Sequence, residues 1–127
     1  MTISDTGKLC YVEIPATDIE QSATFYHEVF GWTIRERGDG ATAFDDSAGH
    51  VSGTWSTNLP IVDEPGFRLY ISVADAESAS RAIEAAGGTI VDRGDLTVAD
   101  IVVTFRDPAG NLLAIHQYKP ENASGQS

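Results

Sequence analysis

KLCYVEIP (residues 8–15) and DIEQSATFYHEVF (residues 18–30) form the stretch of sequence that decides the fold. Side chains of the first segment alternate between two faces, which predicts a β-strand. In the second segment apolar residues recur at helical spacing, and Asp18 is a favourable residue for the start of a helix. Gly31 can adopt the left-handed conformation that ends a helix. We therefore expect a strand followed directly by an amphipathic helix.

The same pattern returns in the second half of the chain. FRLYISV (residues 67–73) predicts a strand, and DAESASRAIEAA (residues 75–86) predicts a helix that begins at Asp75. This aspartate lies 57 residues after Asp18. Self-similarity at a fixed spacing indicates a duplicated structural unit.

Three short strands are expected after each helix, because clusters of turn-forming residues divide the sequence into short segments. The expected strands cover residues 32–37, 41–45 and 51–56 in the first half and residues 89–93, 100–106 and 112–118 in the second. The last turn of each half also repeats, as Asp46-Ser47-Ala48-Gly49 and Asp107-Pro108-Ala109-Gly110. Each half is thus a β-α-β-β-β module.

The sequence predicts a single α+β domain made of these two modules. The first module covers about residues 8–57, a linker covers residues 58–66, the second module covers about residues 67–118, and residues 119–127 are expected to be a disordered tail. One such module leaves a face of its sheet uncovered, so we expect the two modules to combine. The expected result is an eight-stranded half-open sheet around a cleft, with both helices on its convex side.

Composition excludes several classes of partner. The 127 residues carry 19 acidic and 8 basic side chains, for a net charge of −11, which disfavours binding to nucleic acid or to anionic membranes. No apolar run is long enough to span a bilayer, and the first residues lack the apolar core of a signal peptide. The single cysteine, Cys10, suits a reducing compartment, so we expect a cytoplasmic protein. Alternation with Val12 and Ile14 predicts that Cys10 is a buried small hydrophobic residue rather than a nucleophile.

Several short motifs occur in order on this duplicated frame. They are Val12-Glu13-Ile14-Pro15, Phe25-Tyr26 after Asp18, Val29-Phe30-Gly31-Trp32, and Asp107-Pro108-Ala109-Gly110-Asn111. In this combination the chain resembles the vicinal oxygen chelate superfamily, also called the glyoxalase/bleomycin-resistance/dioxygenase group. The resemblance implies two modules around a cleft and a homodimer. The functions that it implies range from metal-dependent isomerases, epimerases and ring-cleaving dioxygenases to metal-free proteins that sequester antibiotics.

The resemblance also identifies four positions at which metal-dependent members hold their metal ion. In this sequence these positions carry Tyr11, Gly53, Arg68 and Ala114. Glycine and alanine have no ligating side-chain atom, arginine offers no lone pair, and a neutral phenol is a poor ligand for divalent ions. We therefore predict no metal ion and no other cofactor.

Strand alternation predicts which side chains line the cleft instead. They are Tyr11, Glu13, Trp55, Arg68, Tyr70, His116 and Tyr118, with Phe44 as a further candidate. Aromatic rings with one cation, one carboxylate and one imidazole are typical of a small-molecule pocket. The same alternation places Ser52 and Thr54 on the helix-facing side, where apolar residues are expected. Either that strand is an edge with an exposed back, or its register is shifted, which would also move Trp55.

Two functions from different classes fit this residue set. The first is a metal-free binding or resistance protein for a small molecule, which the loss of all four ligand positions favours. The second is a metal-independent enzyme of isomerase, lyase or dioxygenase-like type, in which Glu13 and His116 act as an acid/base pair and Tyr11 is a further catalytic candidate. A metalloenzyme with a shifted site at these two residues is a further alternative, although a catalytic metal usually needs three ligands. Arg68 either binds an anionic group of the ligand or forms an internal salt bridge with Glu13.

Overall fold

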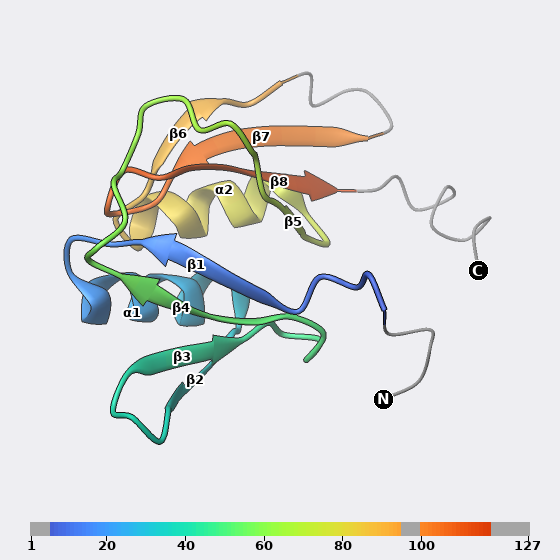
Figure 1. The fold of residues 1–127 in the computed structure, drawn as a ribbon. Coiled ribbons are helices and arrows are strands. Elements are labelled where there is room, and N and C mark those ends of the chain that lie inside the picture. Colours follow the sequence, from blue (N-terminus) through green and yellow to red (C-terminus); the bar gives the residue numbers. More distant parts are fainter. Residues whose placement is uncertain (1–5, 95–99, 118–127) are drawn as a thin grey trace. The chain divides into compact units, whose positions relative to one another are not determined.

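The computed structural model describes residues 6–94 and 100–117 (Figure 1). The chain divides into two compact units, Met1–Leu59 and Pro60–Ser127. Each unit contains one helix and one open four-stranded sheet, in the order strand, helix, three strands. The predicted α+β class and the repeated β-α-β-β-β order are confirmed.

The first unit has a helix on one face of its sheet. Its elements are β1 (Tyr11–Pro15), α1 (Ile19–Phe30), β2 (Thr33–Glu36), β3 (Thr42–Asp45) and β4 (Ser52–Ser56). The strand order is β1-β4-β3-β2, in which β1 runs parallel to β4 and the other neighbours are antiparallel. α1 packs against β2, β3 and β4, so one face of this sheet is covered by the helix.

α1 begins and ends where the sequence predicts. The side chain of Asp18 accepts a hydrogen bond from the backbone N–H of Gln21 at 3.1 Å, which satisfies one free donor of the first turn. Gly31 has a φ of 73°, and its N–H donates to the carbonyl of His27 at 2.9 Å. A residue with a Cβ would be strained in this left-handed conformation. Both signals depend only on neighbouring residues, which is why the sequence predicts them.

Stacked aromatic rings form the core of the first unit. Trp32 lies between Tyr26 and Phe44, with its ring centroid 4.6 Å and 4.5 Å from theirs. Trp55 lies 4.8 Å from Phe44 and 5.9 Å from Tyr26. All four rings are buried. Aromatic contacts of this kind stabilise a core beyond the area that they bury, and here they join α1 to β3 and β4.

The second unit repeats the plan with a core that is mostly aliphatic. Its elements are β5 (Tyr70–Ser72), α2 (Ala76–Ala85), β6 (Thr89–Asp92), β7 (Ile101–Arg106) and β8 (Leu112–Gln117). The strand order is β5-β8-β7-β6, with β5 parallel to β8. α2 packs against β6, β7 and β8, and Ile83, Val103 and Ile115 are fully buried.

The first strand of the second unit is shorter than predicted. A strand over residues 67–73 is expected, but β5 has only three residues. The chain pairs with β8 from Leu69, whose carbonyl accepts a hydrogen bond from the N–H of Ala114 at 3.0 Å. Phe67 is 91% exposed, and Arg68 is exposed as well. These two residues therefore precede the sheet rather than belong to it.

Cys10 is exposed, so the prediction that it is buried is wrong. It precedes β1, and α1 packs against the other three strands of this sheet. Val12 is half-buried and Ile14 is buried, so burial increases along the segment. The alternation is right, but the helix does not extend over the start of the strand.

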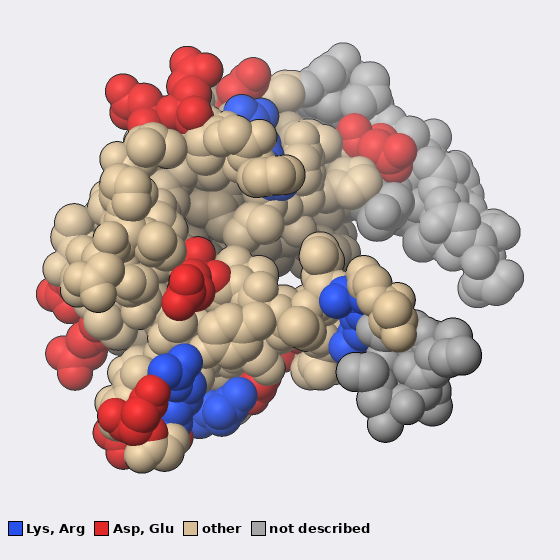
Figure 2. Space-filling view, in the orientation of Figure 1, with Lys and Arg blue, Asp and Glu red and all other residues tan. Residues whose placement is uncertain are grey.

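Acidic side chains occur in several separate groups on the visible surface (Figure 2). No helix in the described part of the chain is long and apolar enough to cross a membrane. Tyr118 and the tail predicted for residues 119–127 lie outside the described residues.

Candidate functional site

Tyr11 and Glu13 share the face of the first sheet that α1 does not cover. In the parallel pair of β1 and β4, Tyr11 lies opposite Ser52 and Glu13 lies opposite Thr54. Successive side chains of a strand point to opposite faces, so these four residues lie on one side of the sheet. We call this side the open face. Tyr11 and Glu13 are both exposed on it.

Trp55 and Phe44 lie on the opposite face, against the expectation. Trp55 is only 3% exposed and packs against Tyr26 of α1. Ser52 and Thr54, which were expected to face the helix, lie on the open face instead. The register of β4 is therefore shifted by one residue from the sequence prediction.

The shift has a local cause in the turn before β4. The backbone N–H of Asp46 donates to the carbonyl of Val51 at 2.9 Å, whereas the N–H of Asp107 donates to the carbonyl of Asn111 at 3.0 Å. The turn of the first unit therefore contains one more residue than the turn of the second. A count that starts from the two aspartates then misplaces every side chain of β4 by one position.

Thr54 rather than Gly53 corresponds to Ala114. Glu13 lies opposite Thr54 in the first unit, and Tyr70, which lies 57 residues after Glu13, is opposite Ala114 in the second. The hydroxyl of Thr54 is neutral, and such a group is a weak candidate for a transition-metal ligand. The correction changes the residue but leaves the predicted lack of metal ligands in place.

Gly53 has a packing role on the α1 side. A Cβ at this position would lie 2.2 Å from the carbonyl oxygen of Val12 and 2.4 Å from Cζ of Phe44. Both distances are far shorter than a carbon atom allows. Glycine at this position lets the ring of Phe44 lie directly over the strand.

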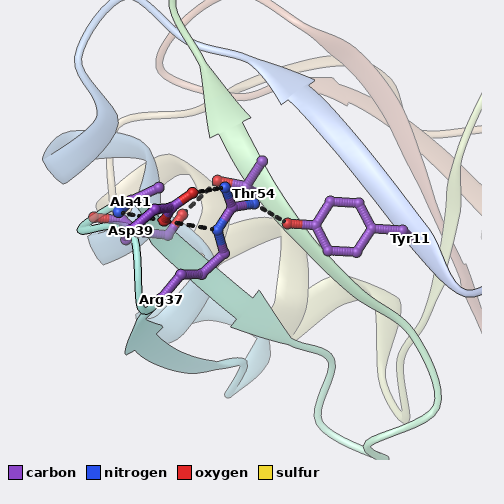
Figure 3. Close-up of polar contacts among 6 residues, drawn as sticks. Tyr11, Arg37, Asp39, Ala41 and Thr54 are labelled. Carbon is purple, nitrogen blue, oxygen red and sulfur yellow. Dashed lines mark hydrogen bonds and ion pairs between the residues drawn. The ribbon is translucent and has the colours of Figure 1, made fainter.

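A polar network crosses the open face from β1 to the β2–β3 turn (Figure 3). Nη1 of Arg37 donates to the hydroxyl of Tyr11 at 2.6 Å. The same guanidinium forms an ion pair with Asp39, in which Nε lies 3.1 Å from Oδ1. Asp39 also accepts a hydrogen bond from the backbone N–H of Ala41 at 3.1 Å. Tyr11 is therefore linked to the tip of the hairpin through two charged side chains.

The network shifts the titration of its charged members. The hydrogen bond from Arg37, with help from the backbone N–H of Ala41, lowers the pKa of Asp39 from 3.8 to about 2. The hydrogen bonds to Asp39 and to Tyr11 raise the pKa of Arg37. The groups are at the surface, where water and salt screen an ion pair. The network therefore fixes positions more than it stabilises the fold.

A second ion pair lies beside the first on the open face. Nε of Arg35 lies 2.9 Å from Oδ2 of Asp45, and the hydroxyl of Ser52 donates to Oδ1 at 2.5 Å. The hydrogen bond from Arg35, and then that from Ser52, lowers the pKa of Asp45. Arg35 and Arg37 thus each have an acidic partner within their own unit.

In the second unit, Tyr70 and His116 share the face that α2 does not cover. Tyr70 lies opposite Ala114, and Ser72 lies opposite His116, while Ile115 points to the buried side. Tyr70 is 56% exposed and His116 is half-buried. Side chains at alternate positions of one strand pair point the same way.

The predicted site residues are divided between the units. Tyr11 and Glu13 belong to the first unit, and Arg68, Tyr70 and His116 belong to the second. Tyr11 and Glu13 share a face of the first sheet, and Tyr70 and His116 share a face of the second, while Arg68 precedes β5. Convergence of all five on one cleft stays a prediction.

The residues at the ligand positions of metal-dependent relatives do not fit a metal ion. Tyr11, Thr54, Arg68 and Ala114 supply a phenol, a hydroxyl, a fixed cation and a methyl group. Divalent ions of this kind prefer imidazole, carboxylate or thiolate. Among residues 6–94 and 100–117, no group of three or more His, Cys, Asp or Glu side chains is arranged to hold a metal ion.

The first unit also contains a groove that the sequence analysis missed. It lies between α1 and the β2–β3 hairpin and has a volume of about 630 Å³. Its lining includes Ala23, Thr24, Gly40, Ala41, Thr42 and Trp55. Short side chains on both walls are a visible signal in the sequence. Without the register of the strands, however, nothing shows that the two walls face each other.

Comparison with known proteins identifies relatives for almost the whole chain. The sequence profile of the Glyoxalase/Bleomycin resistance protein/Dioxygenase superfamily matches residues 8–115. A glyoxylase-like domain-containing protein of Didymella fabae is 31% identical over 94 residues, which cover 65% of this chain and 70% of that protein. The anthracycline biosynthesis protein DnrV of Streptomyces peucetius is 26% identical over 137 residues. That match covers 91% of this chain but only 48% of DnrV.

Solved structures show the same fold. TnmS3 from Streptomyces sp. CB03234, described as an antibiotic binding protein, superposes with a TM-score of 0.68 at 20% sequence identity. The match covers 93% of this chain and 98% of TnmS3. At this identity the likeness establishes the architecture alone.

Proposed function

Since the chain belongs to the Glyoxalase/Bleomycin resistance protein/Dioxygenase superfamily, we propose that it binds and sequesters a small organic molecule without a metal ion. One observation carries the proposal. The positions that the family resemblance assigns to metal ligands hold Tyr11, Thr54, Arg68 and Ala114, which cannot form a transition-metal centre. The proposed binding residues are Tyr11, Glu13, Arg68, Tyr70 and His116.

We infer a planar, largely apolar ligand. Tyr11 and Tyr70 are 45% and 56% exposed, and an exposed phenol ring can stack on a planar molecule while its hydroxyl forms a hydrogen bond. Arg68 can donate to a carbonyl or carboxylate of that molecule. The description of TnmS3 as an antibiotic binding protein and of DnrV as an anthracycline biosynthesis protein supports an aromatic natural product as the ligand class.

Daunorubicin, a fluorescent anthracycline, is a suitable probe of this function. We expect saturable quenching of its fluorescence that EDTA leaves unchanged. Tyr70→Ala should weaken binding about tenfold, which corresponds to roughly 1.4 kcal/mol. Val91→Ala, which removes another exposed apolar side chain of the same unit, is the matched control. Loss of binding on addition of EDTA, or equal binding by both variants, would contradict the proposal.

A metal-independent isomerase or lyase is the second candidate function. Glu13 is exposed on the open face, and His116 lies on the α2-free face of its own sheet, so both can meet a substrate. A carboxylate and an imidazole can move a proton to and from an acidic carbon. Deuterium uptake from D₂O into a chiral α-hydroxy ketone measures this activity. Exchange that is abolished by both Glu13→Gln and His116→Gln would favour the enzyme over the binding protein.

We also propose that the protein forms a homodimer. In the second unit Phe67 and Leu69 are large apolar residues that are exposed, and they lie just before the edge strand β5. Val62, earlier in the same segment, is exposed as well. Exposed apolar side chains near a sheet edge are typical of an interface. Sedimentation velocity should show a dimer that Phe67→Asp shifts towards monomer. A wild-type monomer at tens of micromolar, where a standard interface of about 1,600 Å² should hold, would contradict this.

A further inference from the structure

We propose that the groove between α1 and the β2–β3 hairpin of the first unit is a second small-molecule site. Its ligand is a largely apolar molecule that carries a carbonyl or ether oxygen and no negative charge. This site goes beyond the proposed function, because it lies on the α1 side of the first sheet. Tyr11 and Glu13 lie on the opposite face.

The shape of the groove follows from short side chains on both walls. Ala23 and Thr24 form part of the wall on α1, and Gly40, Ala41 and Thr42 form part of the wall on the hairpin. They leave a volume of about 630 Å³. Pockets for drug-sized ligands measure roughly 300–1,000 Å³. The space therefore suits a compact molecule of a few fused rings.

The indole N–H of Trp55 indicates which chemical group a ligand of the groove should carry. The residue lines the groove and is only 3% exposed. Its indole N–H is buried and has no hydrogen-bond partner within residues 6–94 and 100–117. A buried donor that has lost its water and gained no acceptor costs free energy, and native structures seldom contain one. The N–H is covered by neighbouring atoms, so an acceptor oxygen on a molecule in the groove would supply the missing partner by displacing one of them.

Packing alone explains the ring of Trp55 but not its N–H. The ring lies 4.8 Å from that of Phe44 and 5.9 Å from that of Tyr26, so it fills the space between β3 and α1. A phenylalanine could make aromatic contacts of the same kind without a polar atom. The unpaired donor is thus the feature that points to a ligand.

The charged groups of the protein limit the class of ligand that can bind in the groove. Glu20 lies in the lining, and the protein carries a net charge of −11, so an anion is disfavoured. His27 also lines the groove, and its Nδ1 is 2.9 Å from the carbonyl oxygen of Trp32. Because a carbonyl only accepts, Nδ1 is the donor of this hydrogen bond. These surroundings therefore disfavour a ligand that carries a negative charge.

The polar network of the open face anchors the outer wall of the groove. Asp39 accepts a hydrogen bond from the backbone N–H of Ala41. Arg37 forms an ion pair with Asp39 and donates a hydrogen bond to Tyr11 (Figure 3). Gly40 and Ala41 belong to the lining. The hairpin tip is therefore held from the other face of the sheet, which keeps the groove formed without a ligand.

The indole signals in a ¹H–¹⁵N NMR spectrum test the proposal directly. The chain contains two tryptophans, and Trp55→Phe identifies the signal of Trp55 by its loss. The probes are 1-tetralone and 9-fluorenone, with tetralin and fluorene as matched molecules that lack the carbonyl. We expect the ketones to move the Trp55 proton downfield in a saturable way, because a hydrogen bond deshields it. The hydrocarbons should cause no downfield shift.

Two variants on α1 locate the site. Thr24→Phe places a ring in the groove from an exposed helix position and should weaken ketone binding by at least about tenfold. Gln21→Phe adds the same ring at an exposed position of the same helix that does not line the groove, and should leave binding unchanged. Both variants keep Trp55, so its signal remains the readout.

The proposal is overturned if neither ketone shifts the Trp55 signal, if hydrocarbons and ketones act alike, or if Thr24→Phe binds as the wild type does. The daunorubicin titration with Tyr70→Ala reports on the proposed function separately. If the ketones do not bind in the groove but daunorubicin binds as expected, only this inference is overturned. Ketone binding at Trp55 together with a failed daunorubicin titration overturns only the proposed function.

Discussion

The two units are built on one frame but differ in what fills it. The first unit fills the space between helix and sheet with the rings of Tyr26, Phe44 and Trp55. The corresponding residues of the second unit are Ile83, Phe105 and Ile115, which are also buried. The frame thus requires apolar residues at the right period rather than particular ones. One of the rings of the first unit, that of Trp55, also carries a buried N–H.

The helices differ in the same way. At the positions of Thr24 and His27 on α1, α2 carries Arg81 and Glu84. Glu84 forms an ion pair with Arg93 at 3.7 Å. Long charged side chains therefore lie on α2 at the two positions where Thr24 and His27 line the groove in the first unit. The groove therefore depends on the side chains of the first unit rather than on the fold that both units share.

Replacement of a core ring tests the aromatic core with the largest expected effect. Phe44→Ala should lower the free energy of unfolding by about 3–5 kcal/mol, because it removes a buried ring between Trp32 and Trp55. Ile115→Val, in the aliphatic core, should cost only about 0.5–1.5 kcal/mol. Urea unfolding measures both. Equal costs would mean that the first core does not depend on its stacked rings.

The turns that precede β4 and β8 offer a second contrast. Asp107 is 3% exposed, and its carboxylate accepts hydrogen bonds from the backbone N–H groups of Ala109, Gly110 and Asn111 and from Nδ2 of Asn111. In the first unit, Asp46 is half-buried, and its side chain accepts from the N–H of His50 at 2.8 Å. The second turn is thus the more firmly held.

Replacement of each aspartate by alanine measures how much each turn contributes to stability. Asp107→Ala should destabilise the protein by about 1.5–3 kcal/mol, the range for hydrogen bonds to a charged group, since several half-buried donors lose their acceptor. Asp46→Ala should cost about 0.5–1.5 kcal/mol, because water can replace the acceptor. Thermal and urea unfolding of the two variants decide the order. A larger cost for Asp46→Ala would reverse our account of the two turns.

The smallest effect concerns the ion pair at the hairpin tip. The pKa of Asp39 in the folded protein is about 2, below its ordinary value of 3.8. The stabilisation is therefore complete above pH 4 to 5 and is lost as the pH falls through about 2. Arg37→Gln should return the pKa of Asp39 towards 3.8 and remove this dependence. An NMR titration of the Asp39 carboxyl carbon that gives the ordinary value in the wild type would contradict the network.

Features that depend on neighbouring residues are predictable from this sequence. Asp18 and Asp75 cap the two helices, and Gly31 ends the first, because each acts on backbone groups within a few positions. The duplicated strand order follows from the repeat of these signals. For the same reason, the family resemblance depends on short motifs that the sequence shows directly.

Features that depend on distant residues are less predictable. One extra residue in the turn after Asp46 moves Trp55 from the open face to the core, because side chains alternate at every position. The bond between Tyr11 and Arg37 joins residues that are 26 positions apart, and no pattern near either one announces it. Cys10 is exposed because α1 packs against β2, β3 and β4 and does not cover the start of β1. The sequence of the strand alone does not show how far the helix extends.

Native mass spectrometry of the protein purified without chelator tests the central claim most directly. We expect a protomer that retains an organic molecule, or accepts daunorubicin when it is added, with no mass increment from a metal ion. Elemental analysis of the same sample should find no stoichiometric zinc, nickel, iron or manganese. One metal ion per protomer, whose removal by EDTA lowers the melting temperature, would contradict the account, because a metal that binds the folded state stabilises it by mass action.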